Sequence, residues 1–487
     1  MDRLETQVAV IGAGAAGLYT ALCAARQGAL VTLVSATPLA ESSSYWAQGG
    51  LAAALASDDS PDLHFADTVT AGRGCVRETA ARVLCDEAPA AVDDLAALGV
   101  QFDADRRGQF ALGLEGGHSA RRVVHAGGAA TGRRIVRQLS ALVAHDDRIE
   151  VLERRRVMRV ATDGERATGV QLDDGGRLTG CAIVLATGGA AALWARTTNP
   201  AGAIGGGLVL AFDAGAQLAD LELMQFHPTA VVGDDGADGF LVTEAVRGEG
   251  ARLLDATGER FVDELAPRDE VARAVQRRID FTGASSVGLD MRDVDPALFP
   301  NVVSALRRAG IDPEHELVPV APAAHYMMGG IATDLDGRAT LPGLYAVGEC
   351  SCTGLHGANR LASNSLSECF VFGARAARAA VAEAHGTEAA PARSDVQSAH
   401  DMPSPTISPE SRAALWRYAG LERSGEGLRT LSRDPHPLVR LIARSALARE
   451  ESRGAHQRTD FPDRSSALDG IHVTLGHDGE PVLSRWA

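Results

Sequence analysis

The chain has 487 residues, and its 63 acidic residues exceed its 47 basic residues, which gives a net charge of −16. All 47 basic residues are arginines, so Schiff-base catalysis by a lysine amine and phosphate binding by a P-loop lysine are excluded. The acidic balance argues against nonspecific binding to nucleic acid or to an anionic membrane, because both need a basic surface. The length is sufficient for about two to four domains.

The N-terminal segment predicts a dinucleotide site. An apolar strand over 7–11 leads into a glycine-rich turn over 12–17, and a helix over 18–27 and a second strand over 30–34 follow. The glycines permit a tight turn, and the start of the helix offers free N–H groups and a positive dipole end to a pyrophosphate. The second strand ends without the acidic residue of nicotinamide dinucleotide sites, which weakens that interpretation.

Two later strands also stop at glycines, over 183–189 and 344–349. Together with the first strand they indicate a sheet assembled from discontinuous segments around one extended dinucleotide, which favours FAD over NAD. The more charged segment between them predicts an inserted domain. Residues 386–411 contain four prolines and predict a linker, and leucines recurring at helical spacing over 411–454 predict helices.

The cysteines and the apolar stretches indicate a cytoplasmic protein that does not enter a membrane. Seven cysteines form no C-x-x-C motif, which is typical of reduced, buried thiols, and Cys350 and Cys352 alone are too few for a metal site, so no metal is expected. No signal peptide is expected before the first strand. The longest small-apolar stretch, over 183–195, is shorter than the roughly 20 residues that span a bilayer.

Four short motifs each place a histidine or arginine among glycines or prolines, so we expect these residues in loops rather than on helix faces. The motifs lie at 225–229, at 243–250 with 265–269, at 322–330 and at 354–366. Their cationic members are His227, Arg268, His325 and Arg360. Arginine binds carboxylates through two parallel hydrogen bonds, each worth about 1.5–3 kcal/mol, so these residues predict a cage for a small dianion.

These motifs resemble those of the L-aspartate oxidase family, within the succinate dehydrogenase/fumarate reductase flavoprotein superfamily. The resemblance rests on the four motifs and on 11–17, 45–50 (Tyr-Trp-Ala-Gln-Gly-Gly), 114–119 (Leu-Glu-Gly-Gly-His-Ser), 186–189, 197–200 (Thr-Thr-Asn-Pro) and 451–454 (Glu-Ser-Arg-Gly). It implies an α/β fold with a Rossmann-like FAD-binding domain over 1–220 and 326–390. It also implies an inserted α+β capping domain over 221–325, and a linker and C-terminal helical domain over 391–487.

The resemblance implies FAD-dependent oxidation of L-aspartate to iminoaspartate, with oxygen or fumarate as electron acceptor. Oxygen would yield hydrogen peroxide. The imine would pass to quinolinate synthase in the first step of NAD biosynthesis.

The same resemblance assigns roles to individual residues. Arg268 would donate and accept the proton, with Glu244 or Glu249 as its relay partner. His227, His325 and Arg360 would hold the two carboxylates, and Gln225 and Thr243 would add hydrogen bonds. The residues implied to contact FAD are Gly12, Ala13, Gly14, Ala15, Ala16, Gly17, Ser43, Ser44, Tyr45, Trp46, Ala47, Gln48, Gly49, Gly50, Glu349, Ser365 and Leu366.

Two positions distinguish an aspartate oxidase from its dehydrogenase relatives. Relatives with covalent FAD carry a histidine where this chain has Ser43, so noncovalent FAD is expected. Glu115 stands where the family places an acid to meet the substrate ammonium. Two departures, Ala36 in place of a lysine and Gly206 in place of an aspartate, predict weaker retention of FAD.

Two other functions compete with this one. A soluble fumarate reductase or succinate-oxidising flavoprotein would use the same scaffold, but Glu115 argues against it because neither dicarboxylate carries an ammonium group. A noncatalytic flavin-binding protein would be expected to lack the cationic cage, whose members are all present in the sequence.

Overall fold

The computed structural model of the chain describes residues 3–39, 41–233, 238–386 and 406–486. Its largest sheet has seven strands in the order β6-β2-β1-β9-β8-β7, with β16 beside β9. The strands are β1 (Arg3–Ile11), β2 (Val31–Ser35), β6 (Ile149–Glu153), β7 (Val157–Thr162), β8 (Ala167–Leu172), β9 (Arg177–Leu185) and β16 (Leu344–Ala346). The three predicted strand-then-glycine segments therefore lie side by side and parallel, as expected.

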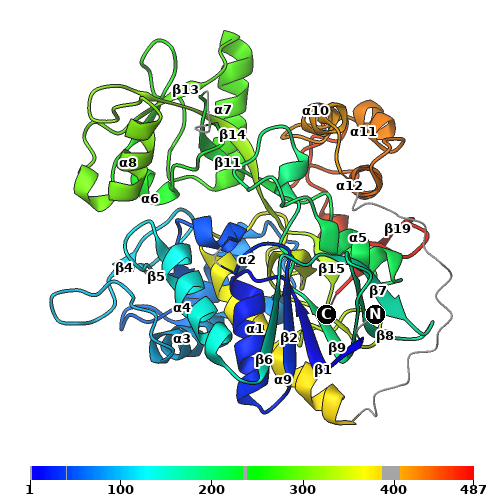
Figure 1. Cartoon of the computed structure of the whole chain (residues 1–487). Coiled ribbons are helices and arrows are strands. Elements are labelled where there is room, and N and C mark those ends of the chain that lie inside the picture. Colours follow the sequence, from blue (N-terminus) through cyan, green and yellow to red (C-terminus); the bar gives the residue numbers. More distant parts are fainter. Residues whose placement is uncertain (1–2, 40, 234–237, 387–405, 487) are drawn as a thin grey trace.

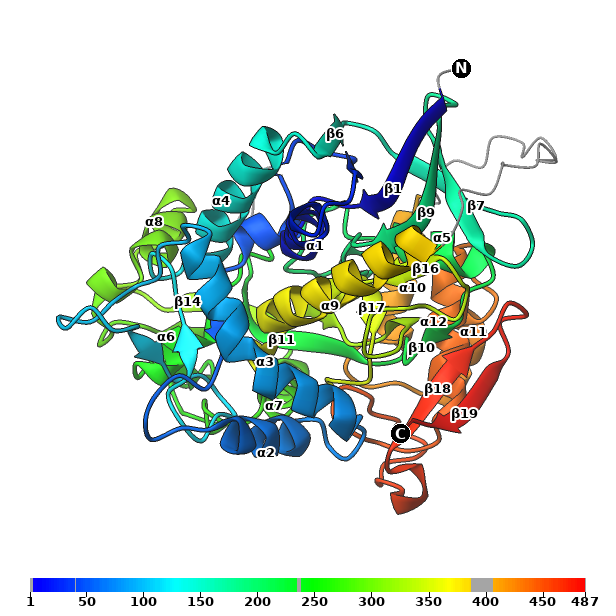
Figure 2. The ribbon, with the colours of Figure 1, turned by 90° about the horizontal axis from the view of Figure 1, so that it is seen from below.

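Helices cover both faces of this sheet. Figure 2 shows α9 running below the sheet with α1 and α3 beside it. These helices are α1 (Ala15–Arg26), α2 (Pro61–Ala71), α3 (Glu78–Ala97), α4 (Thr131–His145) and α9 (Asn364–Gly386). Every residue of α1 except the last, Arg26, is buried, because its alanines let the helix lie close to the sheet and to α9.

The opposite face packs against α5 (Gly206–Asp213) and three helices near the C-terminus. These are α10 (Pro409–Tyr418), α11 (Gly425–Leu431) and α12 (Pro437–Ala448), within the range where the leucine spacing predicts helices. Of the predicted linker, residues 387–405 lie outside the described residues. Pro409 begins α10, and the Ser408 hydroxyl accepts a hydrogen bond from the Ser411 N–H at 3.1 Å.

A second, antiparallel sheet stands above the first with its own helices and apolar core (Figure 1). Its strand order is β11-β14-β13-β12, and the strands are β11 (Met224–Val231), β12 (Arg252–Leu254), β13 (Val287–Asp290) and β14 (Val318–Met327). Its helices are α6 (Glu244–Gly248), α7 (Arg268–Thr282) and α8 (Pro300–Arg308). The chain enters this layer along β11 and leaves it along β14.

Two smaller sheets complete the fold. One joins β10 (Leu218–Ala219), β15 (Gly330–Ala332) and β17 (Ser351–Cys352) to β18 (Ile471–Leu475) and β19 (Pro481–Arg485), so the C-terminal segment holds two strands besides its predicted helices. The other joins β3 (Leu51–Ala52), β4 (Leu112–Gly113) and β5 (Val123–Val124). Short 3₁₀ turns are η1 (Ser43–Trp46), η2 (Ala191–Leu193), η3 (Pro296–Leu298), η4 (Gly348–Cys350) and η5 (Ser466–Leu468).

Among the described residues, none of the helices combines the length and apolarity needed to cross a bilayer. All seven cysteines are free, and five of them are buried.

Candidate active site

The ends of β1, β9 and β16 form the cradle expected for a dinucleotide. Gly12, after β1, has a φ of 112°, and a Cβ there would lie 2.3 Å from the carbonyl oxygen of Ala186, after β9. A Cβ at Gly17 would lie 1.9 Å from the Gly12 carbonyl oxygen. Only glycine fits at these two positions, and ligands of open parallel sheets bind at this carboxyl edge.

The other residues predicted to contact FAD gather around this edge. The Ala15 N–H, at the start of α1, donates to the Ser44 hydroxyl at 3.1 Å. A Cβ at Gly348, next to Glu349, would touch Ala16, and one at Gly49 would lie 3.5 Å from the Ser363 hydroxyl. These contacts bring parts of 12–17, 43–50 and 348–349 together at this edge. That these segments and residues 365–366 contact FAD remains a prediction.

Several features of this cradle fit a bound FAD. Glu349 is half-buried, and burial raises the pKa of its carboxyl to about 7 although the Met327 N–H donates to it at 2.9 Å. The buried hydroxyl of Thr187 has no hydrogen-bond partner among the described residues. A Cβ at Gly206 would meet nothing within 4 Å, so the space beside this missing acid is open. Trp46, in η1, is 68% exposed.

His227 and His325 lie on adjacent strands, so the prediction that they occupy loops was wrong. His227 belongs to β11 and is paired with Ala323 of β14, and the two imidazole rings are 5.2 Å apart between centroids. The pairing of the two strands shifts register between His227 and Ala230. This irregularity tolerates Pro228, which has no N–H to donate and which suggested a loop.

Both histidines are held as neutral donors. Burial foremost, and then the nearby arginines, lower the pKa of His227 and of His325 well below the ordinary value. The Thr229 N–H donates to Nδ1 of His227 at 3.3 Å, so the proton of that neutral ring lies on Nε2. The Thr198 hydroxyl lies 2.8 Å from Nδ1 of His325 and can fix the same tautomer there. Each ring can then donate from Nε2.

Arg268 is the first residue of α7 and is held from two sides. Its Nε donates to Oε2 of Glu244 at 2.6 Å, and its Nη1 donates to Oε1 of Gln225 at 3.2 Å. The Gln225 amide nitrogen donates to the Arg360 carbonyl at 2.9 Å, so this glutamine orients the two arginines relative to each other.

Of the two glutamates predicted as relay partners, Glu244 contacts Arg268, whereas Glu249 makes no hydrogen bond or ion pair with it among the described residues. Glu244 is buried and follows Thr243 at the start of α6, whereas Glu249 is exposed. The second carboxylate oxygen of Glu244 lies 3.4 Å from the Arg247 guanidinium, which extends the chain of charged groups. Burial foremost lowers the pKa of Arg247 from its ordinary value. Arg247 lies within one of the quoted motifs, but its role was not predicted.

Arg360 stacks on an aromatic ring that was also not predicted. Its guanidinium carbon lies 4.5 Å from the centre of the Tyr326 ring, and its Nη1 donates to Ser365 at 3.0 Å. The Tyr326 hydroxyl donates to Glu368 at 2.8 Å. The buried Nε of Arg360 has no partner among the described residues, so it is free to bind a substrate carboxylate. Burial foremost lowers the pKa of Arg360 to about 10.

Glu115 presents one unpaired oxygen to the same region. Its Oε2 accepts a hydrogen bond from Ser363 at 2.7 Å, and its Oε1 lies 3.6 Å from Nε2 of His125 and has no hydrogen-bond partner among the described residues. Burial raises the pKa of this carboxyl, but His125, Ser363 and Arg268 outweigh that effect and lower it to about 2. Ser363 has a φ of 62°, which is uncommon for a residue other than glycine.

Comparison with known proteins shows similarity over the whole chain. Residues 7–366 match the family described as FAD binding domain, and residues 434–480 match the family described as fumarate reductase flavoprotein C-term. L-aspartate oxidase of Caulobacter vibrioides is 48% identical, covering 98% of this chain and 97% of that protein. L-aspartate oxidase of Streptomyces coelicolor is 41% identical, covering 99% and 93%. A solved quinol-fumarate reductase with menaquinol molecules has a TM-score of 0.88 at 27% identity, covering 99% of this chain and 98% of that one.

Proposed function

Because this chain belongs to the L-aspartate oxidase family, it is a FAD-dependent enzyme that oxidises L-aspartate to iminoaspartate, and we propose that the cage around His227 and His325 holds the two carboxylates of the substrate. The observation that best supports L-aspartate as the substrate is the unpaired oxygen of Glu115 beside a buried cluster of arginines. A buried carboxylate oxygen without a donor is costly, and an ammonium group supplies the missing donor.

The charges of the cage suit L-aspartate better than succinate. With His227 and His325 neutral, the guanidiniums of Arg247, Arg268 and Arg360 outnumber the carboxylates of Glu115 and Glu244 by one. L-Aspartate carries two carboxylates and one ammonium, so its net charge of minus one neutralises the buried site. Succinate would leave the site with one uncompensated negative charge and with Glu115 still unpaired.

The side chains divide the work of binding and proton transfer. His227, His325 and Arg360 donate hydrogen bonds that hold the carboxylates and fix the orientation of the substrate Cα–H. FAD, when bound in the cradle, supplies the acceptor for the hydride that leaves Cα. The ammonium nitrogen must also lose a proton, and Arg268, Glu244 and Arg247 form the hydrogen-bonded chain of charged groups that can carry a proton to or from the site. Gln225 keeps Arg268 and Arg360 in register, and Thr243 places Glu244.

We further propose how FAD is held and which molecules accept the electrons. FAD is noncovalent because Ser43 offers no imidazole for a covalent link. Fumarate held in the dicarboxylate cage, or oxygen, would accept the electrons taken from the substrate, and oxygen would yield hydrogen peroxide. We also propose that the imine passes to quinolinate synthase in NAD biosynthesis and that the protein acts in the cytoplasm.

The division into domains is proposed as follows. Residues 1–220 and 326–390 bind FAD, residues 221–325 form the capping domain, and residues 391–487 form the linker and C-terminal domain. The separate core of β11–β14 with α6–α8 supports the capping unit.

An anaerobic mixture of the flavin-loaded protein with L-aspartate tests the function. Bleaching of the yellow flavin by L-aspartate, and not by succinate, is the expected result. Bleaching by succinate alone would instead indicate a succinate-oxidising flavoprotein. Absence of bleaching by any dicarboxylate would refute both enzymatic functions and leave a flavin-binding protein. Acid precipitation that leaves the yellow colour in the supernatant would show that FAD is noncovalent.

A further inference from the structure

Asp269, the residue after Arg268, is a buried carboxylate whose ion-pair partners lie outside the cage. Its side chain is 3% exposed, and its partners among the described residues are Arg73, whose Nη2 donates to the two carboxylate oxygens at 3.1 and 3.2 Å, and Arg273 at 3.7 Å. Arg73 also pairs with Glu270. Arg73 comes from the loop after α2, so this contact, which we term the clasp, ties the first turn of α7 to a distant segment.

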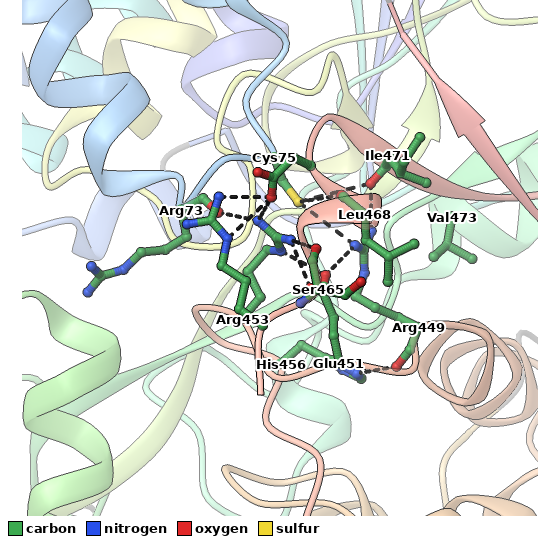
Figure 3. Close-up of polar contacts among 12 residues, drawn as sticks. Arg73, Cys75, Arg449, Glu451, Arg453, His456, Ser465, Leu468, Ile471 and Val473 are labelled. Carbon is green, nitrogen blue, oxygen red and sulfur yellow. Dashed lines mark hydrogen bonds and ion pairs between the residues drawn. The ribbon is translucent and has the colours of Figure 1, made fainter. Parts of the chain in front are cut away.

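The backbone of Arg73 is itself held by a buried cluster of the C-terminal segment. Its φ of 57° is uncommon for an arginine, and its carbonyl oxygen accepts a hydrogen bond from Nη1 of Arg453 at 2.6 Å. Arg453 pairs with both oxygens of Glu451 at 2.7 and 2.8 Å, and Glu451 also accepts from Arg449 at 3.1 Å. Figure 3 shows these side chains gathered beside Arg73 and Cys75.

A second contact places α7 on the same C-terminal loop. Nη1 of Arg273, four residues after Asp269, donates to the Gly454 carbonyl at 3.0 Å. Gly454 follows Arg453, so both contacts of the first turns of α7 converge on one rigid, charge-paired platform. On the other side of the same turn, Arg268 reaches Glu244 and Gln225 in the cage.

We propose that Arg73 is a positioning residue for the oxidation of L-aspartate: through Asp269 it fixes the first turn of α7 and thereby the place of Arg268 over the substrate. The inference rests on the proposed function of the cage. The clasp joins the capping layer to the loop after α2, directly beside the residue that reaches into the cage. A displacement of about 1 Å in a reacting group can cost about 100-fold in rate, so loss of the clasp should slow the reaction.

The test compares Arg73→Gln and Asp269→Asn with Arg277→Gln in the flavin-loaded full chain. Arg277 lies two turns further along α7 and pairs with Glu422 of the C-terminal segment at 2.9 Å, but both side chains are well exposed and far from Arg268 along the helix. Arg277→Gln therefore removes an ion pair between α7 and the C-terminal segment without touching the first turn.

The expected result is a rate of flavin reduction by L-aspartate that falls about 10- to 100-fold in Arg73→Gln and in Asp269→Asn. The double variant should be little slower than either single variant, because the two residues form one contact. Binding of succinate, measured by perturbation of the flavin spectrum, should change less than about threefold, and Arg277→Gln should reduce its flavin at the rate of the unsubstituted protein.

A second readout does not depend on the substrate. Hydrogen exchange of the backbone amides over 268–273 should rise in Arg73→Gln and remain unchanged in Arg277→Gln. An Arg73→Gln protein with unchanged flavin reduction would overturn the proposal, as would an equal slowing in Arg277→Gln. If Arg73→Gln fails to fold, a folded and fully active Asp269→Asn overturns it. If the unsubstituted protein does not oxidise L-aspartate, the proposed function fails, and the exchange measurement alone decides whether the clasp fixes α7.

Discussion

Replacing Glu115 by glutamine removes one negative charge from the cage and keeps the size of the side chain. The Ser363 hydroxyl, which donates to Oε2 of Glu115 at 2.7 Å, can donate to the amide oxygen in the same way. The substitution therefore changes the second oxygen, Oε1, which is buried and has no hydrogen-bond partner among the described residues. In the proposed complex this oxygen receives the substrate ammonium.

The size of the expected change in KM follows from the proposed contact between Oε1 of Glu115 and the substrate ammonium. A hydrogen bond between two charged groups is worth about 1.5–3 kcal/mol, which corresponds to a KM for L-aspartate about 10- to 150-fold higher in Glu115→Gln. Succinate has no ammonium group, and the substitution removes a charge that repels it, so its binding should be unchanged or tighter. The ratio of the two effects separates loss of the ammonium site from general damage.

The rise in KM for L-aspartate caused by Glu115→Gln should also be independent of pH between about pH 5 and 9. The pKa of the Glu115 carboxyl is lowered from 4.5 to about 2, because His125, Ser363 and Arg268 outweigh the effect of burial. The carboxylate is therefore ionised throughout the range of about pH 5 to 9, and stability that depends on its charge is lost only as the pH falls from 4.5 toward 2. An acid limb in the rate between pH 5 and 7 must come from another group.

Anaerobic stopped-flow reduction of the flavin by L-aspartate gives the affinity and the rate, and titration with succinate gives the control. A Glu115→Gln protein with the KM and rate of the unsubstituted protein would refute the assignment of the ammonium site. Equal weakening of L-aspartate and succinate would refute the charge argument, because that result would show a distorted cage.

Three further changes test other parts of the site. The affinity of the FAD-free protein for FAD should rise as the pH increases toward about 7 and then stay constant. The reason is that the pKa of the Glu349 carboxyl is raised to about 7 and that the carboxyl accepts hydrogen bonds best when ionised. Glu349→Gln should abolish this pH dependence in fluorescence titrations of FAD binding. Glu244→Gln should lower kcat by about 100-fold or more, whereas the exposed Glu249→Gln should not change it. Equal kcat values for these two variants would contradict the relay. Gly206→Asp should slow loss of FAD on dialysis, because its side chain would enter open space; faster loss would show that the missing acid does not explain cofactor retention.

The sequence predicts the cradle well because its signals are local. Gly12 and Gly17 lie within one turn, and their spacing specifies close backbone approach whatever the rest of the fold does. The sequence did not predict the secondary structure around His227 and His325, because it depends on distant segments. Pro228 and Pro322 beside them are typical of loops, but both lie in strands where the pairing of β11 and β14 is irregular, and that tolerance depends on a partner strand far away in the sequence.

Contacts between residues far apart in the sequence could not be predicted, because they also depend on distant segments of the chain. Nothing near Arg73 in the sequence indicates that its side chain reaches Asp269 or that Arg453 holds its backbone. Strand β18 pairs with the distant β10 as well as with β19, and a helical prediction for the C-terminal segment omits it. A motif was enough to predict a role for Glu115. The residues that orient site side chains, Ser363 beside Glu115 and Tyr326 beneath Arg360, could be identified only from the structure.

His227 and His325, which we propose bind the substrate carboxylates, lie on the strands by which the chain enters and leaves the capping layer, while Arg268 begins a helix within it. Any swing of that layer would pivot about β11 and β14, so His227 and His325 would lie near its axis, and Arg268 would stay close to it because it donates to Gln225 of β11. The dicarboxylate cage would therefore keep its geometry while the outer part of the layer moves, and a bound molecule would meet the same groups throughout.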